Sequence, residues 1–212
     1  MGIIKQGILG GFSGKVANVV GSSWKGIAVM KSLPLSVANP RTASQVHQRD
    51  KFSVSIGLGS VLLSNWVKPL WDRWAQRMSG FNAFCSKNIE LANLAQGEEY
   101  KDFVMSSGKM SETIPSSIYA SIAAEQVEVE WADDAGQGLK LATDILYISG
   151  IGNDLSKILK LADPTVRSGL SALVNVNWTP IVGEKAYLAV AFLRSNGTIV
   201  SDSKMIEFTF VA

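Results

Sequence analysis

Apolar and polar residues alternate with a period of two in the last part of the chain. Val127, Val129 and Trp131 are separated by Glu128 and Glu130, which is typical of a strand with one buried face and one face in water. Further strands are predicted at 141–147, 173–178, 187–193 and 205–210, with a hairpin turn at 195–198. About six or seven short strands favour an immunoglobulin-like or fibronectin-like β-sandwich over residues 118–212.

The period changes to that of a helix in residues 40–93. Asn39 and Pro40 have the chemistry of a helix N-cap followed by the first helical position, so a helix is predicted from about Pro40. A second helical stretch at 65–77 places Trp66, Leu70 and Trp74 at intervals of four. A third short helix is expected to end near residue 93.

Residues 1–33 have no helical period. Glycines recur throughout this segment among small and apolar residues, which predicts short strands and turns in an extended arm. Because glycine loses the most backbone freedom on ordering, such an arm should lie against its own subunit or a neighbour. The predicted organisation is therefore α+β: an N-terminal arm and helical module at 1–95, a linker at 96–117 that carries one strand near 103–105, and the sandwich.

The tryptophans of the second helical stretch have three interpretations. Aromatic bulk at this spacing most often anchors a hydrophobic core, but tryptophan is also enriched at subunit interfaces. A platform on which a ligand stacks is a third option.

Composition and charge narrow the functional classes. Apolar residues make up 47% of the chain and charged residues 18%, with a formal net charge of +2. The basic residues are too scattered to indicate nucleic-acid binding. The N-terminus does not read as a secretory signal and no apolar run is long enough for a membrane helix, so we expect synthesis in the cytoplasm. Cys85 is the one cysteine, which excludes an internal disulfide, and we expect it to be buried.

Motifs for catalysis are not found. His47 is the one histidine and is expected on the polar side of a helix. The segment 11–16 resembles a phosphate-binding loop, but its glycine spacing is short and Val16 stands where Ser or Thr would bind magnesium. We therefore predict that the protein is not an enzyme, with no catalytic, metal or cofactor-binding residues. Glu128 and Glu130 are expected on a solvated sheet face.

Two blocks of the sequence carry a resemblance. The opening MGIIKQGILGGFSGKVANVVGSSWKGIAVMKSLP, with VANPRTASQVHQRDKF, resembles an uncharacterised family of bacterial and prophage proteins. The series from Asn39 to Phe52, then 71–74 and 79–84 with Asn88, looks like a block of phage structural proteins. These resemblances imply a component of a virion or phage-like particle.

We therefore expect a self-assembling structural subunit whose arm binds other copies, forming a tube, shell or fibre. The alternative is an adhesion or carbohydrate-binding module that uses sandwich loops and Trp131 or Trp178. Partners would be other copies of the chain, with other particle proteins as a further option and no membrane. The predicted interface residues are Phe12, Val16, Val19, Trp24, Ile27, Arg41, Arg49, Trp66, Trp71 and Trp74.

Overall fold

The computed structural model describes residues 3–4, 12–24, 27–36, 39–95, 98–123 and 125–212, with the side chains of Ile3, Ile4 and Trp24 outside the description. The chain divides into two compact units, residues 1–45 and residues 46–212. The predicted boundaries at 95 and 117 do not coincide with this division. They differ because the helices and the C-terminal strands share one hydrophobic core, which places both in the second unit.

The N-terminal unit is a small antiparallel sheet. Its strands pair in sequence order, and they are β1 (Ile3–Ile4), β2 (Phe12–Val16), β3 (Val19–Trp24) and β4 (Ile27–Ser32). The expected strands and turns are thus present. Because the strands pair with one another, the segment is a meander in place of a single extended arm.

The helical segment begins later than predicted. Helix α1 spans Ala43–Val61, and Thr42 accepts a hydrogen bond from the backbone of Gln45, so Thr42 has the contact of an N-cap. A π-helical turn, η1 (Leu63–Val67), leads into the short helix α2 (Lys68–Trp71). Helix α3 spans Gly80–Asn88 and is capped by Ser79. Because α2 ends at Trp71, the predicted helical face does not continue to Trp74.

The C-terminal strands form one sheet of seven strands in the order β13-β11-β8-β9-β10-β7-β6, with every neighbouring pair antiparallel. The two ends of this sheet also meet. Val211, just after β13, donates a backbone hydrogen bond to Ala120 and accepts one from Ile122, beside β6. The strands are β6 (Ser117–Ser121), β7 (Gln126–Glu130), β8 (Ile145–Ile151), β9 (Ile158–Leu161), β10 (Ser171–Val176), β11 (Lys185–Leu193) and β13 (Ile206–Thr209).

This closure differs from the expected immunoglobulin-like sandwich. A sandwich has two separate sheets packed face to face, whereas this single sheet curls until its edges pair, as in a barrel. Periodicity revealed most of the strands but not which strands pair. The predicted hairpin is present, with Gly197 at φ 69° and Arg194 donating to Ile199.

The segment 96–117 is not a linker. It contains β5 (Val104–Ser106), close to the predicted strand, which pairs with β12 (Ser203–Lys204). Its apolar side chains are buried, among them Phe103, Met105 and Met110. Asn88 fixes α3 to β5, because its side-chain amide exchanges hydrogen bonds with the backbone of Val104.

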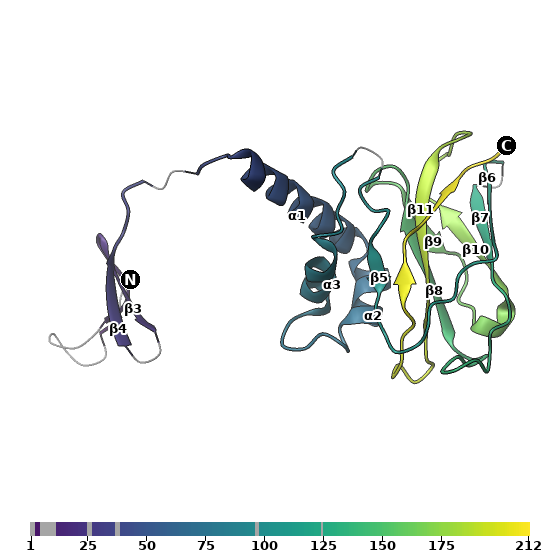
Figure 1. The fold of residues 1–212 in the computed structure, drawn as a ribbon, viewed down its shortest axis with the longest axis horizontal. Helices are drawn as coiled ribbons and strands as arrows, with labels where there is room; N and C mark the ends of the chain where they lie inside the picture. Colours follow the sequence, from purple (N-terminus) through teal and green to yellow (C-terminus); the bar gives the residue numbers. More distant parts are fainter. Residues whose placement is uncertain (1–2, 5–11, 25–26, 37–38, 96–97, 124) are drawn as a thin grey trace. The chain divides into compact units, whose positions relative to one another are not determined.

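Two hydrophobic cores lie on the two faces of the seven-stranded sheet. The inner core contains Val127, Leu188 and Phe192. The outer core lies between the sheet and the helices, where Tyr187, Ala189 and Ala191 contact the helical side chains. Strand β11 is therefore buried on both faces, and it reads as a continuous apolar run. Figure 1 shows α2 and α3 beside the sheet, with β5 between.

Candidate functional site

The turn between β2 and β3 sets the register of the N-terminal sheet. Val16 lies opposite Val19, which leaves Ala17 and Asn18 as a two-residue turn, and Ala17 has a φ of 48°. A positive φ is what the favoured two-residue hairpin turns require, although alanine adopts it at some cost. Leu33 donates to the Asn18 carbonyl and extends the ladder between β3 and β4.

The register assigns the side chains of this sheet to two faces of different character. One face carries no charged residue among those described; we call it the uncharged face, and it comprises Phe12, Gly14, Val16, Val19, Gly21, Ser23, Ala28, Met30 and Ser32. The opposite face carries Lys15 and Lys31 on either side of Val20.

The uncharged face is not covered by the unit that forms it. Met30 is 68% exposed and Val16 is 49% exposed, and Ile27 on the other face is 62% exposed. The Phe12 ring packs on Gly21, where an added Cβ would lie 2.8 Å from the ring and 2.2 Å from the Phe12 carbonyl oxygen. Among the described residues of β1–β4, Gly21 is the one classed as buried. The described side chains of this sheet therefore form no hydrophobic core.

The predicted interface residues fall into three groups. Phe12, Val16 and Val19 share the uncharged face, and Ile27 lies on the opposite one. Arg41 is exposed, as is Arg49 on α1. The side chain of Trp24 lies outside the described residues.

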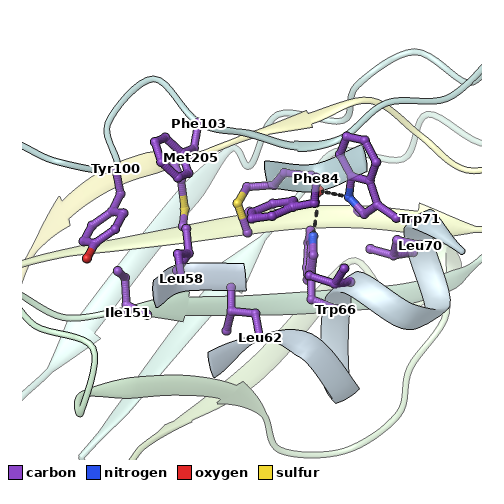
Figure 2. Close-up of a cluster of buried hydrophobic side chains, with 14 of the residues drawn as sticks. Leu58, Leu62, Trp66, Leu70, Trp71, Phe84, Tyr100, Phe103, Ile151 and Met205 are labelled. Atoms are coloured by element: carbon purple, nitrogen blue, oxygen red, sulfur yellow. Dashed lines mark hydrogen bonds between the residues drawn. The ribbon is translucent and has the colours of Figure 1, made fainter. Parts of the chain in front are cut away.

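The tryptophans of the helical segment form the third group, and here two of the predicted interface residues are wrong. Trp66 is fully buried and Trp71 is 7% exposed, so both belong to the outer core of their own subunit. Both indole Nε1–H groups donate to the carbonyl oxygen of Met105, at 2.8 Å and 2.7 Å. Figure 2 shows the two rings converging on that acceptor. Trp74 is half-buried and packs at the edge of the same core.

The rings proposed for the ligand-binding alternative are also engaged inside the subunit. Trp131 is 3% exposed and donates to the Arg167 carbonyl. Trp178 is half-buried, donates to Glu184 and packs edge-on against Phe210. Burial thus removes Trp131 from any ligand platform, whereas Trp178 stays partly exposed.

A cluster of charged side chains lies inside the sheet, and the sequence analysis did not predict it. Arg167 in η2 (Arg167–Gly169) is fully buried, and its Nη1 contacts Asp134 at 2.5 Å and Thr113 at 2.7 Å. Asp134 also binds Lys140 at 2.6 Å. Burial alone would raise the pKa of the Asp134 carboxyl, but the hydrogen bonds from Lys140, Thr113 and Arg167 hold that pKa below its ordinary value of 3.8.

A groove with a volume of about 490 Å³ lies between η1 and strands β8 and β9. Its polar lining residues are Ser64, Asn65, Tyr147 and Lys160, with no carboxylate or imidazole among the lining residues. In the described part of the chain, no group of three His, Cys, Asp or Glu side chains is placed to hold a metal ion. His47 is exposed and Cys85 is buried, as predicted.

A comparison with protein-family models gives one match, which covers residues 11–207 under the description "Family of unknown function (DUF6266)". The chain belongs to this family. The match includes β2–β4 and extends through the seven-stranded sheet into β13, so it covers parts of both compact units. A match to an uncharacterised family agrees with the expectation from the sequence. No curated protein and no solved structure matches the chain. No helix within the described ranges is long and apolar enough to cross a membrane.

Proposed function

We propose that this DUF6266 protein is a non-enzymatic structural subunit that self-assembles through its N-terminal sheet. One observation carries the proposal: β1–β4 form a sheet in which three large apolar side chains are 49–68% exposed, namely Val16, Ile27 and Met30. A small sheet without a hydrophobic face packed on something else is marginally stable in water. A partner surface would supply the missing burial.

The distribution of charge supports a protein partner for this surface. The uncharged face has no lysine, arginine or carboxylate among its described residues, and both lysines of the sheet are on the other face. Exposed apolar surface with charges kept to one side is characteristic of contacts between proteins. A surface that binds phosphate or an acidic membrane would instead carry lysine and arginine side chains on this face.

We call the second unit, residues 46–212, the body. Its construction fits a subunit whose N-terminal sheet joins one body to the next. Residues 46–212 contain two hydrophobic cores, and the seven-stranded sheet pairs its own edges. A closed sheet offers little unpaired backbone to other chains. Assembly through the N-terminal sheet would therefore leave the body intact and display its surface.

The sequence resemblance to prophage and phage structural proteins supports a finer proposal. In it, the subunit is synthesised in the cytoplasm and becomes part of a virion or phage-like particle, as a component of a tube, shell or fibre. Contacts between copies are the expected binding reaction, and other particle proteins are the further partners. The adhesion alternative loses the contribution of Trp131, because that ring is buried and donates to the Arg167 carbonyl.

The test compares the full-length chain with a chain that lacks residues 1–33, by light scattering and negative-stain microscopy. Both should show the same circular dichroism signature of the folded body. Oligomers or regular particles from the full-length chain, lost on truncation, are the expected result. A monomer for both proteins over a wide range of concentration and salt would overturn the proposal and redirect the search to glycan ligands.

A further inference from the structure

The outer edge of β4 is the longest open strand edge of the N-terminal sheet. β4 has six residues and stands at the end of the order β1-β2-β3-β4, whereas β1 at the other end has two. In an antiparallel ladder, successive residues point their backbone groups alternately toward and away from the neighbouring strand. Leu33 bonds to Asn18 across this ladder. The backbone N–H and C=O groups of Val29 and Lys31 therefore point toward β3. Those of the alternate residues of β4 point away from β3.

The outward-facing residues are Ala28, Met30 and Ser32. Each presents one N–H and one C=O on the side of β4 where no described strand pairs. Unpaired edge groups of this kind are a template for another strand. The register thus gives a row of donors and acceptors centred on Met30.

Residues 46–212 of a neighbouring copy offer few unpaired strand edges with which β4 could pair. The end strands of the seven-stranded sheet meet at the pairing of Val211 with Ala120 and Ile122. Strands β5 and β12 have three and two residues. The β4 edge of another copy, in contrast, has the same length and the same pattern of outward groups.

We propose that β4 pairs with β4 of a second copy, antiparallel and across a two-fold axis at Met30. This inference rests on the proposed function and names the contact that begins assembly. Met30 lies opposite Met30 of the second copy, and Ala28 lies opposite Ser32 of the second copy. All three outward residues then form hydrogen-bonded pairs, giving about six backbone hydrogen bonds.

The side chains are compatible with this register. Partners across an antiparallel pair lie on the same face, so the uncharged faces of the two copies form one continuous surface that includes both Met30 side chains. On the other face Val29 lies opposite Lys31 of the second copy, and no lysine lies opposite a lysine. A register centred on Val29 would use fewer of the outward groups.

A contact that pairs a surface with itself is isologous and closes after two copies. The β4 pairing therefore forms a dimer with one continuous sheet, and this dimer is the unit from which a larger particle would grow. Growth beyond the dimer then takes place through the doubled uncharged face, because the β4 edge is already used.

Cysteine cross-linking tests the register in full-length protein with Cys85→Ala as background. Cysteines at position 30 of the two copies would have Cα atoms about 5.5 Å apart, within disulfide range. Ile27 is the control position, because its side chain is 62% exposed, close to the 68% of Met30. Its counterpart in the second copy lies about 20 Å away, from the rise per residue of a strand. Mild oxidation should therefore link M30C and not I27C.

A charge exchange at the same position gives a second measurement. M30K alone and M30E alone should lose self-association, because each places like charges opposite one another. Mixing the two variants should restore a dimer with about twice the mass of one chain. The matched pair I27K and I27E should show no such complementation, since position 27 does not face itself.

The outcomes separate this inference from the proposed function. Oligomers without M30C linkage, or with I27C linking as readily, would overturn the β4 pairing while leaving self-assembly in place. Absence of any oligomer from the unmodified full-length chain would overturn both. Linkage of M30C together with restoration in the mixture of M30K and M30E would establish the pairing.

Discussion

The guanidinium of Arg167 and the carboxylate of Asp144 form an ion pair in which neither side chain has any exposed surface, with Nε and Oδ2 3.4 Å apart. The guanidinium also lies 3.9 Å from the centre of the Phe192 ring. Asp144 accepts a backbone hydrogen bond from Leu141 and contacts Arg194. Burying this arginine is tolerable because acceptors and an aromatic face replace the water that it loses.

Replacing Arg167 should therefore be among the most damaging changes in the body. Arg167→Met leaves Asp134 and Asp144 in a site built around a positive charge, and breaking a buried pair typically costs about 3–5 kcal/mol. Chemical denaturation at neutral pH measures the loss. Arg194→Met is the matched control, because Arg194 contacts the same Asp144 but its side chain is 17% exposed. Equal losses for the two variants would contradict the central role of Arg167.

Trp66 and Trp71 should show coupled effects, because they share the carbonyl oxygen of Met105. Each tryptophan to phenylalanine change removes one donor but leaves the other, so each should cost about 1 kcal/mol for the hydrogen bond, besides the packing change. The double variant leaves a buried carbonyl without either donor and should cost more than the sum of the two. A double-mutant cycle by urea unfolding tests this, and additive losses would contradict it.

Acid should destabilise the body through Asp134. Its folded-state pKa lies below the ordinary 3.8, so the stabilisation is complete above the unfolded-state pKa and is lost as the pH falls from about 3.8 through the folded-state value. Asp134→Asn should lower the unfolding free energy at pH 7 and flatten its fall in acid. Unfolding midpoints measured between pH 7 and pH 2 provide the check. An unchanged acid slope in D134N would rule out this carboxylate as a source of the pH dependence.

Gly21→Val should damage the N-terminal sheet and spare the body. An added Cβ would meet the Phe12 carbonyl oxygen at 2.2 Å, and backbone cannot move aside cheaply. We expect loss of self-association with no change in the cooperative unfolding of residues 46–212. Ser23→Val is the control, because Ser23 lies on the same face at an exposed position. Dynamic light scattering and thermal unfolding on the same samples separate the two effects.

Local chemistry predicted most of the segments that become strands and the position of the hairpin turn at 195–198, but not β6 or β9. Alternation placed Val127 and Val129 inside and Glu128 outside, as observed, because a strand sends successive side chains to opposite faces. Helical context predicted a buried Cys85 and an exposed His47, and both predictions are confirmed. The uncharged face of the N-terminal sheet was not predicted, because it depends on the register between strands.

The sequence by itself determined most of the strands, the presence of helices in residues 40–93 and the expectation of an uncharacterised family. Only the tertiary structure decided how the strands close into one sheet, why Trp66 and Trp71 are core residues, and where Arg167 finds its acceptors. The physical reason is distance along the chain: Trp66 meets Met105, Arg167 meets Thr113 and Val211 meets Ala120. Periodicity reports on neighbours within one element, whereas closure, shared cores and buried charges come from contacts between remote segments.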